Sequence, residues 1–390
     1  MSVVYVHIGL PKTGTTHLQD RLWRNRDLAL QSSGLLYPGN VISDHFHAAV
    51  HLQPERYLDW VDPAFAGTWP TLLGQIRAWP QISLLSHELY STATVDQIER
   101  LMADLSFADE VHVIATVRDL GRQLPSVWQE NVKNQRRASF DEFVDSVAFA
   151  SEGRRTGGPV VVSTPADDAP ADEVDEEPFW EFQDYVGILE RWSRAVGPER
   201  VHIVTVPPRG AASGDTLWDR FLRVMNIDPV PLRIPVPSLN SSLSAPQAEF
   251  LRGLNRRLQP DVIEWRRYER IIKGQVIGEI LFEAPSGPPQ GLSDKSREWA
   301  AGESRRMVAA VRDAGYNVVG DLDDLVVSPE HDAGDVPPPS DGEVLDVALD
   351  TIAAMVLAAP LPKVGPRART RAANVVRRVK RRVIAARRSS

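Results

Sequence analysis

A short segment near the N-terminus combines the residue types that bind phosphate. Gly9-Leu-Pro-Lys-Thr-Gly-Thr-Thr16 lies between an alternating β-branched run, Val3–Ile8, and a helical pattern that begins at Thr15. A strand–loop–helix unit of this kind directs backbone N–H groups and a helix N-terminus at one point, where an anion is favoured. Gly14 lets the backbone approach an oxyanion, Lys12 adds a positive charge, and the threonines add hydroxyl donors. The segment therefore predicts a phosphate-binding loop.

The position of the lysine separates this loop from the loop that binds nucleoside triphosphates. That loop reads G-x-x-x-x-G-K-[ST], with lysine directly after the last glycine. Here Lys12 precedes Gly14, and the strand pattern Val111–Val117 runs into Arg118 without an aspartate to hold magnesium. A nucleotide kinase or NTPase is therefore the weaker alternative. A binding protein that keeps a nucleotide site without chemistry is a second alternative.

A second pattern that could bind phosphate follows the strand Val111–Val117. Arg118 ends this strand, and Ser126 follows eight residues later, directly after Pro125, where we expect it to begin a helix. Arginine can grip a phosphate bidentately, and a serine hydroxyl at a helix start can reach the same oxygens. The alternative is that Arg118 pairs with a carboxylate and Ser126 caps a helix.

Together, Pro11-Lys-Thr-Gly-Thr-Thr16 and the Arg118–Ser126 pair resemble the two nucleotide-binding motifs of the sulfotransferases that use 3'-phosphoadenylyl sulfate (PAPS), in particular the bacterial branch. The resemblance implies a P-loop-like fold and transfer of a sulfuryl group to an acceptor hydroxyl of a carbohydrate, a lipid or another small molecule. Adenosine 3',5'-bisphosphate (PAP) would be released. It also implies the ligands: the 5'-phosphosulfate would contact Lys12, Thr13, Gly14, Thr15, Thr16 and His17, and the 3'-phosphate would contact Arg118 and Ser126.

Further segments resemble the same family less specifically. They are Gln129-Glu-Asn-Val-Lys133, Asp184-Tyr-Val-Gly-Ile-Leu-Glu-Arg-Trp192, Asn240-Ser-Ser-Leu243 and Gly320-Asp-Leu-Asp-Asp324. The glycine-rich motif of the animal cytosolic enzymes is not found, so the residues that contact the adenine remain unassigned.

Sulfuryl transfer requires a cation at the departing oxygen and a base for the acceptor proton. Lys12 is the expected cation. For the base, the strand pattern Ile82–Ser86 is followed by His87 and Glu88, and parallel sheets present catalytic groups at strand C-termini. The family carries a histidine at this place in some branches and a glutamate in others. We favour Glu88, with His87 in reserve, and expect the two to face opposite ways. Glu88 could instead pair with Lys12 or with a surface arginine.

The sequence gives little support for a metal site. There are no cysteines, and His47 and His51 have the i, i+4 spacing of a zinc pair but lack the rest of a zinc motif. A sulfuryl group carries less charge than a terminal phosphate, so we expect no metal. Together with His45, these histidines are expected to line the acceptor pocket or to pack in the core. His7 is expected to be buried and hydrogen-bonded.

The order of the elements predicts the fold class and three regions. Strand patterns separated by helical segments indicate βαβ units, hence an α/β three-layer sandwich with a mostly parallel sheet between helices. Residues 1–327 would form the sulfotransferase domain, interrupted by an acidic, disordered insertion at 151–178. Residues 328–342 read as a Pro-rich linker, and 343–390 as a helix followed by a basic tail.

Charge is distributed unevenly along the chain. Residues 360–390 hold eleven of the 44 Lys and Arg and no acid, which leaves 33 basic against 52 acidic residues elsewhere. A basic amphipathic tail could bind an anionic membrane surface, or fold back on the acidic body. An acidic body argues against a nucleic-acid partner. The N-terminus resembles a buried strand more than a signal peptide, so a cytoplasmic protein is expected, and a basic tail that binds lipid would make it peripheral at the membrane.

Overall fold

The computed structural model describes residues 1–58, 61–155, 179–208, 210, 214–237, 242–284, 287–327 and 337–359. Its centre is a six-stranded sheet with the order β2-β3-β1-β4-β5-β6, and every adjacent pair of strands is parallel. The strands are β1 (Val3–His7), β2 (Leu35–Leu36), β3 (Ile82–Ser86), β4 (Glu110–Val117), β5 (Val201–Thr205) and β6 (Asn317–Val319). Parallel pairing brings all their C-terminal ends to one edge.

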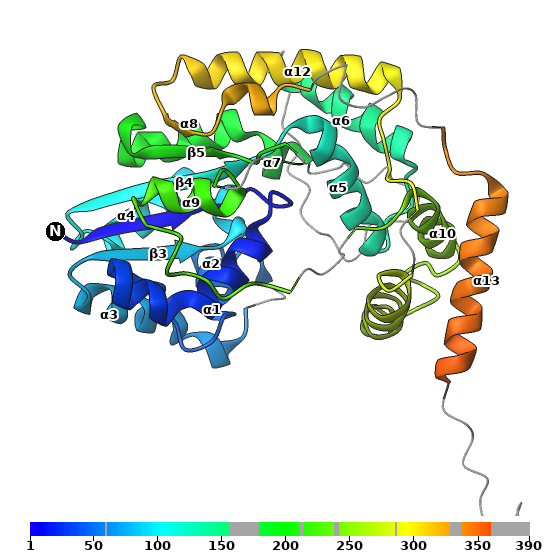
Figure 1. Cartoon of the computed structure of the whole chain (residues 1–390), viewed down its shortest axis with the longest axis horizontal. Helices are drawn as coiled ribbons and strands as arrows, with labels where there is room; N and C mark the ends of the chain where they lie inside the picture. Colours follow the sequence, from blue (N-terminus) through cyan, green and yellow to red (C-terminus); the bar gives the residue numbers. More distant parts are fainter. Residues whose placement is uncertain are drawn as a thin grey trace, which may run out of the picture.

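Helices cover both faces of the sheet (Figure 1). Alternate strand residues face opposite sides, and Tyr5 packs with α1 (Thr15–Ser33) and α9 (Leu217–Val224) on one face. Val4 and Val6 belong to the core on the other face, with α4 (Val95–Asp104) and α8 (Tyr185–Val196). Helices on both faces of a parallel sheet bury its central strands, which explains their apolar residues, whereas the edge strand β6 is mostly exposed. The predicted α/β three-layer sandwich is confirmed.

Further helices complete these layers. They are α2 (Asp44–Leu52), α3 (Thr68–Ala78), α5 (Leu120–Lys133), α6 (Phe140–Arg155), α7 (Phe179–Gln183) and α12 (Asp294–Arg312), with the short helical turns η2 (Pro63–Phe65), η3 (Glu88–Thr92), η4 (Pro198–Arg200) and η6 (Leu322–Leu325). The long helix α12 packs against α5, α6 and α8. α5 begins after β4 at the edge of the sheet and packs against α6 and α12.

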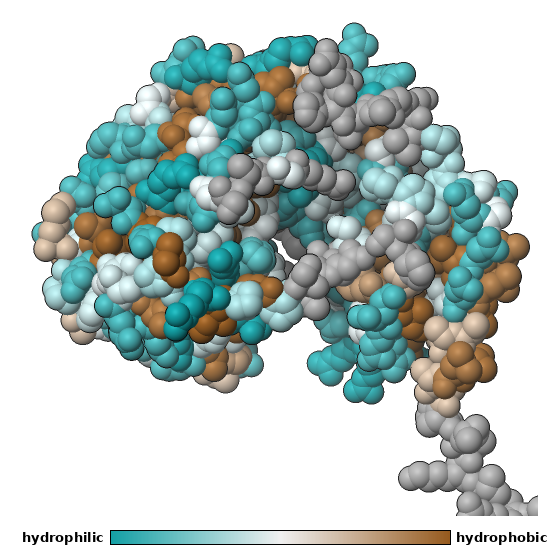
Figure 2. Space-filling view, viewed as in Figure 1, coloured by the Kyte–Doolittle hydropathy of each residue, from teal (hydrophilic) through white to brown (hydrophobic). Residues whose placement is uncertain are grey.

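A smaller helical group packs beyond α5. It consists of α10 (Ala245–Asn255), α11 (Trp265–Tyr268), the π-helical segment η5 (Glu269–Leu281) and α13 (Asp341–Ala358). α10 contacts α5 on one side and α13 on the other, and α13 also contacts η5. Figure 1 shows α13 at the outer side of this group, farthest from the sheet. In Figure 2 the surface is hollowed between the part over the sheet and the part over α10 and α13.

The structure corrects two predicted boundaries. Residues 151–155 belong to α6 and are not part of the acidic insertion, and residues 341–342 already form the first turn of α13. Ser340 caps α13 through its side chain, which fixes this helix start. Most of the acidic insertion and of the linker, and all of the tail from 360, lie outside the described residues, so those predictions remain untested. Within the described part of the chain, no helix combines the length and apolarity needed to cross a membrane.

Candidate active site

The predicted phosphate loop connects β1 to α1 at the C-terminal edge of the sheet. β1 ends at His7, and α1 begins at Thr15 with Gly14 as its N-cap residue. Gly14 has a left-handed backbone with φ of 96°, and no side chain caps the N-terminus of α1. The first N–H groups of a helix need an acceptor from outside the helix. An uncapped helix start that follows a lysine-containing loop is suited to bind an anion.

Two glycines allow neighbouring elements to approach the loop. A Cβ added to Gly14 would lie 2.7 Å from Cδ2 of Leu217 in α9, and one added to Gly9 would lie 2.8 Å from Cβ of Glu88. Both glycines also have positive φ, which other residues rarely adopt. Gly9 thus makes room for Glu88 directly beside the phosphate loop.

A buried chain of hydrogen bonds connects the loop to the strands behind it. Nδ1 of His7 lies 2.7 Å from Oγ of Ser86, and Nε2 lies 3.4 Å from Oγ1 of Thr116. Oγ1 of Thr116 lies 2.6 Å from Oγ1 of Thr13, which donates to the carbonyl of Leu10 at 2.6 Å. The chain therefore connects β3, β1 and β4 to the loop.

The end of this chain fixes the direction of its protons. Thr13 donates its only hydroxyl proton to a carbonyl, so it must accept from Thr116, which in turn accepts from Nε2–H of His7. Nε2 of His7 then carries a proton, and in a neutral ring Nδ1 accepts from Ser86. Burial lowers the pKa of His7 to about 3, which agrees with a neutral ring. The expectation that His7 is buried and hydrogen-bonded is confirmed.

This arrangement gives Thr13 a role within the loop. Its hydroxyl is buried and engaged with Leu10 and Thr116. In this arrangement the side chain shapes the loop, and the prediction that Thr13 contacts a phosphate remains untested. Thr15 is buried at the start of α1, while Thr16 and His17 are exposed. Although the side chain of His17 is largely exposed, partial desolvation by its neighbours and the nearby Arg21 lower its pKa.

Lys12 contacts a carboxylate that the sequence did not identify. Its Nζ lies 2.9 Å from Oε2 of Glu130 in α5, and Nζ of Lys133 lies 3.8 Å from the same oxygen. The neighbouring lysines, chiefly Lys12, lower the pKa of Glu130 against the effect of burial. Burial lowers the pKa of Lys133 to about 8. Two ammonium groups thus share one carboxylate beside the loop. The segment Gln129–Lys133 resembled the family, but nothing in it assigned this contact.

Arg118 and Ser126 lie near the same edge of the sheet. The backbones of Thr116 and Gly9–Leu10 are hydrogen-bonded, so Arg118, two residues later, follows the strand next to the loop. Ser126 is in the second turn of α5, which begins at Leu120, so the expectation that Ser126 begins a helix is wrong.

The helical spacing places Ser126 on the face of α5 that meets the loop. Nε2 of Gln123 donates to the carbonyl of Pro11 at 2.8 Å, and Glu130 contacts Lys12. Residues three and four apart share a helix face, so Ser126 lies on the same face between these two contacts. Nη2 of Arg118 donates to the carbonyl of Arg122, which lies one helical turn before Ser126 in α5. The two residues predicted to hold one phosphate thus come from adjoining positions.

His87 and Glu88 follow β3 and differ in their surroundings. His87 is the N-cap of η3, its Nδ1 accepts from N–H of Leu89 at 3.2 Å, and its ring lies 5.4 Å from that of Phe46. Burial lowers its pKa. Glu88 is the first residue of η3 and lies against Gly9. The Cβ of Glu88 therefore lies close to Gly9 at the start of the phosphate loop.

Two of the histidines after α1 stack on aromatic neighbours and the third lines a small cavity, and whether they also line an acceptor pocket remains untested. His45 is buried, stacks on Tyr37 and bonds to the carbonyl of Pro38, and His47 stacks on Phe65. His51 lines a small cavity of about 170 Å³ between α2, α3 and α4. Among the described residues no group of His, Asp and Glu could hold a metal.

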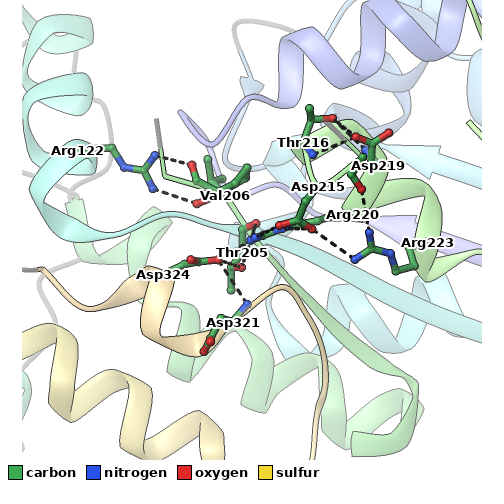
Figure 3. Close-up of polar contacts among 12 residues, drawn as sticks. Arg122, Thr205, Val206, Asp215, Thr216, Asp219, Arg220, Arg223, Asp321 and Asp324 are labelled. Atoms are coloured by element: carbon green, nitrogen blue, oxygen red, sulfur yellow. Dashed lines mark hydrogen bonds and ion pairs between the residues drawn. The ribbon is translucent and has the colours of Figure 1, made fainter. Parts of the chain in front are cut away.

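A second charged cluster lies at the end of β5 (Figure 3). The buried Arg220 of α9 pairs with Asp215, at 2.5 Å, and with Asp324 of η6, and it also donates to Oγ1 of Thr205 at 2.7 Å. Arg122 joins the same strand end by donating to the carbonyls of Val206 and Pro207. Arg220 is saturated by two carboxylates, so this cluster ties α9, β5 and η6 together. Asp324 belongs to the family-like segment that ends the domain.

Known proteins give limited guidance. No family model matches this chain, and no curated protein matches its sequence. The structure is similar to a solved sulfotransferase structure from Alicyclobacillus acidocaldarius, with 15% sequence identity over 80% of this chain and 95% of that chain, and a TM-score of 0.37. At this level the similarity does not identify a reaction or a ligand, so a functional proposal must rest on the residues of the site.

Proposed function

We propose that this protein transfers a sulfuryl group from PAPS to an acceptor hydroxyl and releases PAP. The observation that carries the proposal is the uncapped N-terminus of α1 behind Lys12, which follows β1, and β1 pairs with β4, the strand directly before Arg118. A nucleotide with phosphates at both ends of its ribose needs two anion sites on one edge. Adjacent strands β1 and β4 supply them at the motif spacing of the PAPS enzymes.

The residues take separate roles in this reaction. The backbone N–H groups at the start of α1, with Thr15 and Thr16, bind the 5'-phosphate, and Arg118 with Ser126 binds the 3'-phosphate. PAPS supplies an activated sulfuryl group. The acceptor oxygen forms a bond to sulfur as the bond from sulfur to the bridging oxygen breaks, and Lys12 stabilises the charge on the departing phosphate oxygen.

Glu88 is proposed as the base that accepts the hydroxyl proton. Its backbone lies against Gly9, so it is placed at the loop that would hold the sulfuryl end of the donor. His87 remains the reserve, since its Nδ1 is engaged with the backbone of Leu89. The acceptor itself, a carbohydrate, lipid or other small molecule with a hydroxyl, is left open by the site.

Ligand binding separates this proposal from its alternatives. We expect PAP and PAPS to raise the unfolding temperature more than ATP with magnesium does, because only they fill both anion sites. Lys12→Met and Arg118→Met should each weaken the PAP effect, whereas Lys295→Met, an exposed control on α12, should not. Stabilisation by ATP and magnesium alone would favour the NTPase alternative. Stabilisation by PAPS without transfer to any acceptor would favour a binding protein.

The base is tested by transfer rates from labelled PAPS to a panel of hydroxyl acceptors. Loss of a general base typically costs 10²–10⁴-fold. Glu88→Gln should therefore lower the rate by roughly 10²-fold or more with little change in PAP binding, whereas Glu190→Gln, an exposed control on α8, should not. If His87→Ala lowers the rate and Glu88→Gln does not, the assignment passes to His87.

The anionic-membrane hypothesis concerns residues 360–390 and remains a proposal that rests on their charge alone. Binding to vesicles that contain phosphatidylserine, weakened by salt and lost when residues after 360 are deleted, would support it. Vesicle binding that survives the deletion would contradict it. We propose no nucleic-acid partner, because the rest of the chain is acidic.

A further inference from the structure

The outer side of α13 exposes a continuous apolar stripe. Its other side packs on α10 and η5, where Thr351 is buried. The stripe consists of Leu345, Leu349, Ile352 and Val356, which are 57%, 55%, 57% and 68% exposed. Figure 2 shows the hydrophobic colour running along this helix at the edge of the molecule. Single exposed apolar residues are ordinary, but a stripe of four on one helix marks a contact surface.

The spacing of the stripe suits a second helix. Steps of four, three and four residues keep the four side chains on one line, as in the seam of a two-helix coiled coil. The spacing is also symmetric about the centre between residues 350 and 351. A two-fold axis there would place Leu345 against Val356 of an antiparallel partner helix, and Leu349 against Ile352. A self-complementary surface of this kind is what a two-fold dimer requires.

Charge selects the direction of the pair. α13 carries Asp341, Glu343, Asp346 and Asp350 and no basic residue, and the chain after residue 359 carries eleven Lys and Arg and no acid. A parallel pair would place the acidic first turns of the two helices side by side. In an antiparallel pair, the acidic first turns of one helix lie beside the C-terminal end of the other, which carries no acid and after which the sequence becomes basic. The same four acids disfavour an anionic membrane as the occupant of this face.

We propose that the stripe on α13 binds α13 of a second copy of this chain, antiparallel, to form a two-fold dimer. The surface lies at the outer side of the helical group, away from the sheet edge that carries the phosphate loop (Figure 1). The dimer leaves that loop open in both copies. The proposal is independent of the reaction that the site performs.

Mass measurement of the full chain tests the dimer. Sedimentation equilibrium at micromolar concentration should give twice 43.3 kDa. The double variant Leu349→Asp with Ile352→Asp should be monomeric, and Phe149→Asp, an equally apolar exposed control on α6, should stay dimeric. Thermal unfolding and PAP binding report whether each variant is folded. A wild-type monomer at all concentrations, or a double variant that stays dimeric, would overturn the proposal.

Disulfide trapping tests the direction of the pair, because the chain has no cysteine of its own. Chains with Leu345→Cys and chains with Val356→Cys should cross-link when mixed. Neither variant should cross-link with itself, since in an antiparallel pair the two copies of either residue are roughly 16 Å apart along the axis. Self-cross-linking of each variant would show a parallel pair and refute the model. Vesicle binding that the Leu349→Asp, Ile352→Asp variant loses, with no dimer in solution, would show that lipid covers this face.

Discussion

Two charged clusters at the same edge of the sheet have opposite balances. At the end of β5, the buried guanidinium of Arg220 is held by the two carboxylates of Asp215 and Asp324, and the more exposed Arg223 also pairs with Asp215. Beside the phosphate loop, the ammonium groups of Lys12 and Lys133 share the carboxylate of Glu130. The first cluster has no positive charge left for a ligand. The second has an excess of positive charge beside the uncapped N-terminus of α1, which favours an incoming anion.

This difference leads us to expect a structural role for the first cluster and ligand binding for the second. An arginine whose donors are all engaged by the protein fixes its neighbours in place, and its loss leaves buried carboxylates without a partner. A lysine whose single carboxylate is itself shared can exchange that partner for a phosphate or sulfate. Mutations in the first cluster should therefore reduce stability, and mutations in the second should change function.

The largest effect, on the unfolding free energy, is expected when Arg220 is replaced. Arg220→Met removes the arginine partner of the largely buried Asp324 at the end of β5, whereas Asp215 keeps Arg223. Breaking a buried ion pair from one side typically costs about 3–5 kcal/mol of unfolding free energy. Denaturant unfolding measures it, with Arg194→Met, an exposed arginine paired with Glu190, as control. Equal losses of unfolding free energy in Arg220→Met and Arg194→Met would mean that the burial of the cluster at β5 adds nothing to stability.

Loss of Lys12 should show the reverse pattern. Lys12→Met should lower sulfuryl transfer by roughly 10²–10³-fold, the usual effect of removing one charge-stabilising donor. Glu130 keeps Lys133 as a partner, so the unfolding free energy should change by less than about 1 kcal/mol. Initial rates and denaturant unfolding of the same preparation measure both quantities. If Lys12→Met is destabilised as strongly as Arg220→Met, the proposed difference between the two clusters is wrong.

Acid should weaken the support of the loop through His7. Its pKa is about 3 in the folded protein, against about 6.5 in an unfolded chain. The unfolded state then binds more protons below pH 6.5, so the stability from neutral His7 is complete above pH 6.5 and is lost as pH falls toward 3. The slope is at most about 1.4 kcal/mol per pH unit. Unfolding of wild type and His7→Gln between about pH 7 and 5 should show a shallower slope in the variant. An unchanged slope would place the titration elsewhere, for example at His45.

The smallest expected effect concerns the shared carboxylate. Glu130→Gln removes a negative charge beside Lys12, so PAP should bind more tightly, by roughly fivefold for a partly exposed pair. The pKa of Lys133 should be lower in this variant, because the carboxylate of Glu130 raises that pKa in the wild-type protein. Calorimetry and NMR titration of lysine side chains measure the two shifts. Weaker PAP binding in the variant would indicate that Glu130 positions Lys12 instead of competing for it.

Local patterns predicted much of this protein because they depend on near neighbours. The alternation in Val3–His7, the glycines of the loop and the periodicity of Tyr185–Val196 specify a strand, a turn and a helix without reference to the rest of the chain. The order of these elements then leaves few topologies beyond a parallel α/β sheet. The motif spacing likewise placed Lys12 and Arg118 at one edge.

Contacts between distant segments could not be predicted from the sequence. The bond between Lys12 and Glu130 joins residues 118 positions apart, and Thr13 meets Thr116 across 103 positions. A side chain that looks free to bind phosphate, such as that of Thr13, is assigned only when its neighbours on other strands are known. The type of each local element follows from short-range sterics and periodicity. The partner of each polar side chain follows from packing, which only the tertiary structure decides.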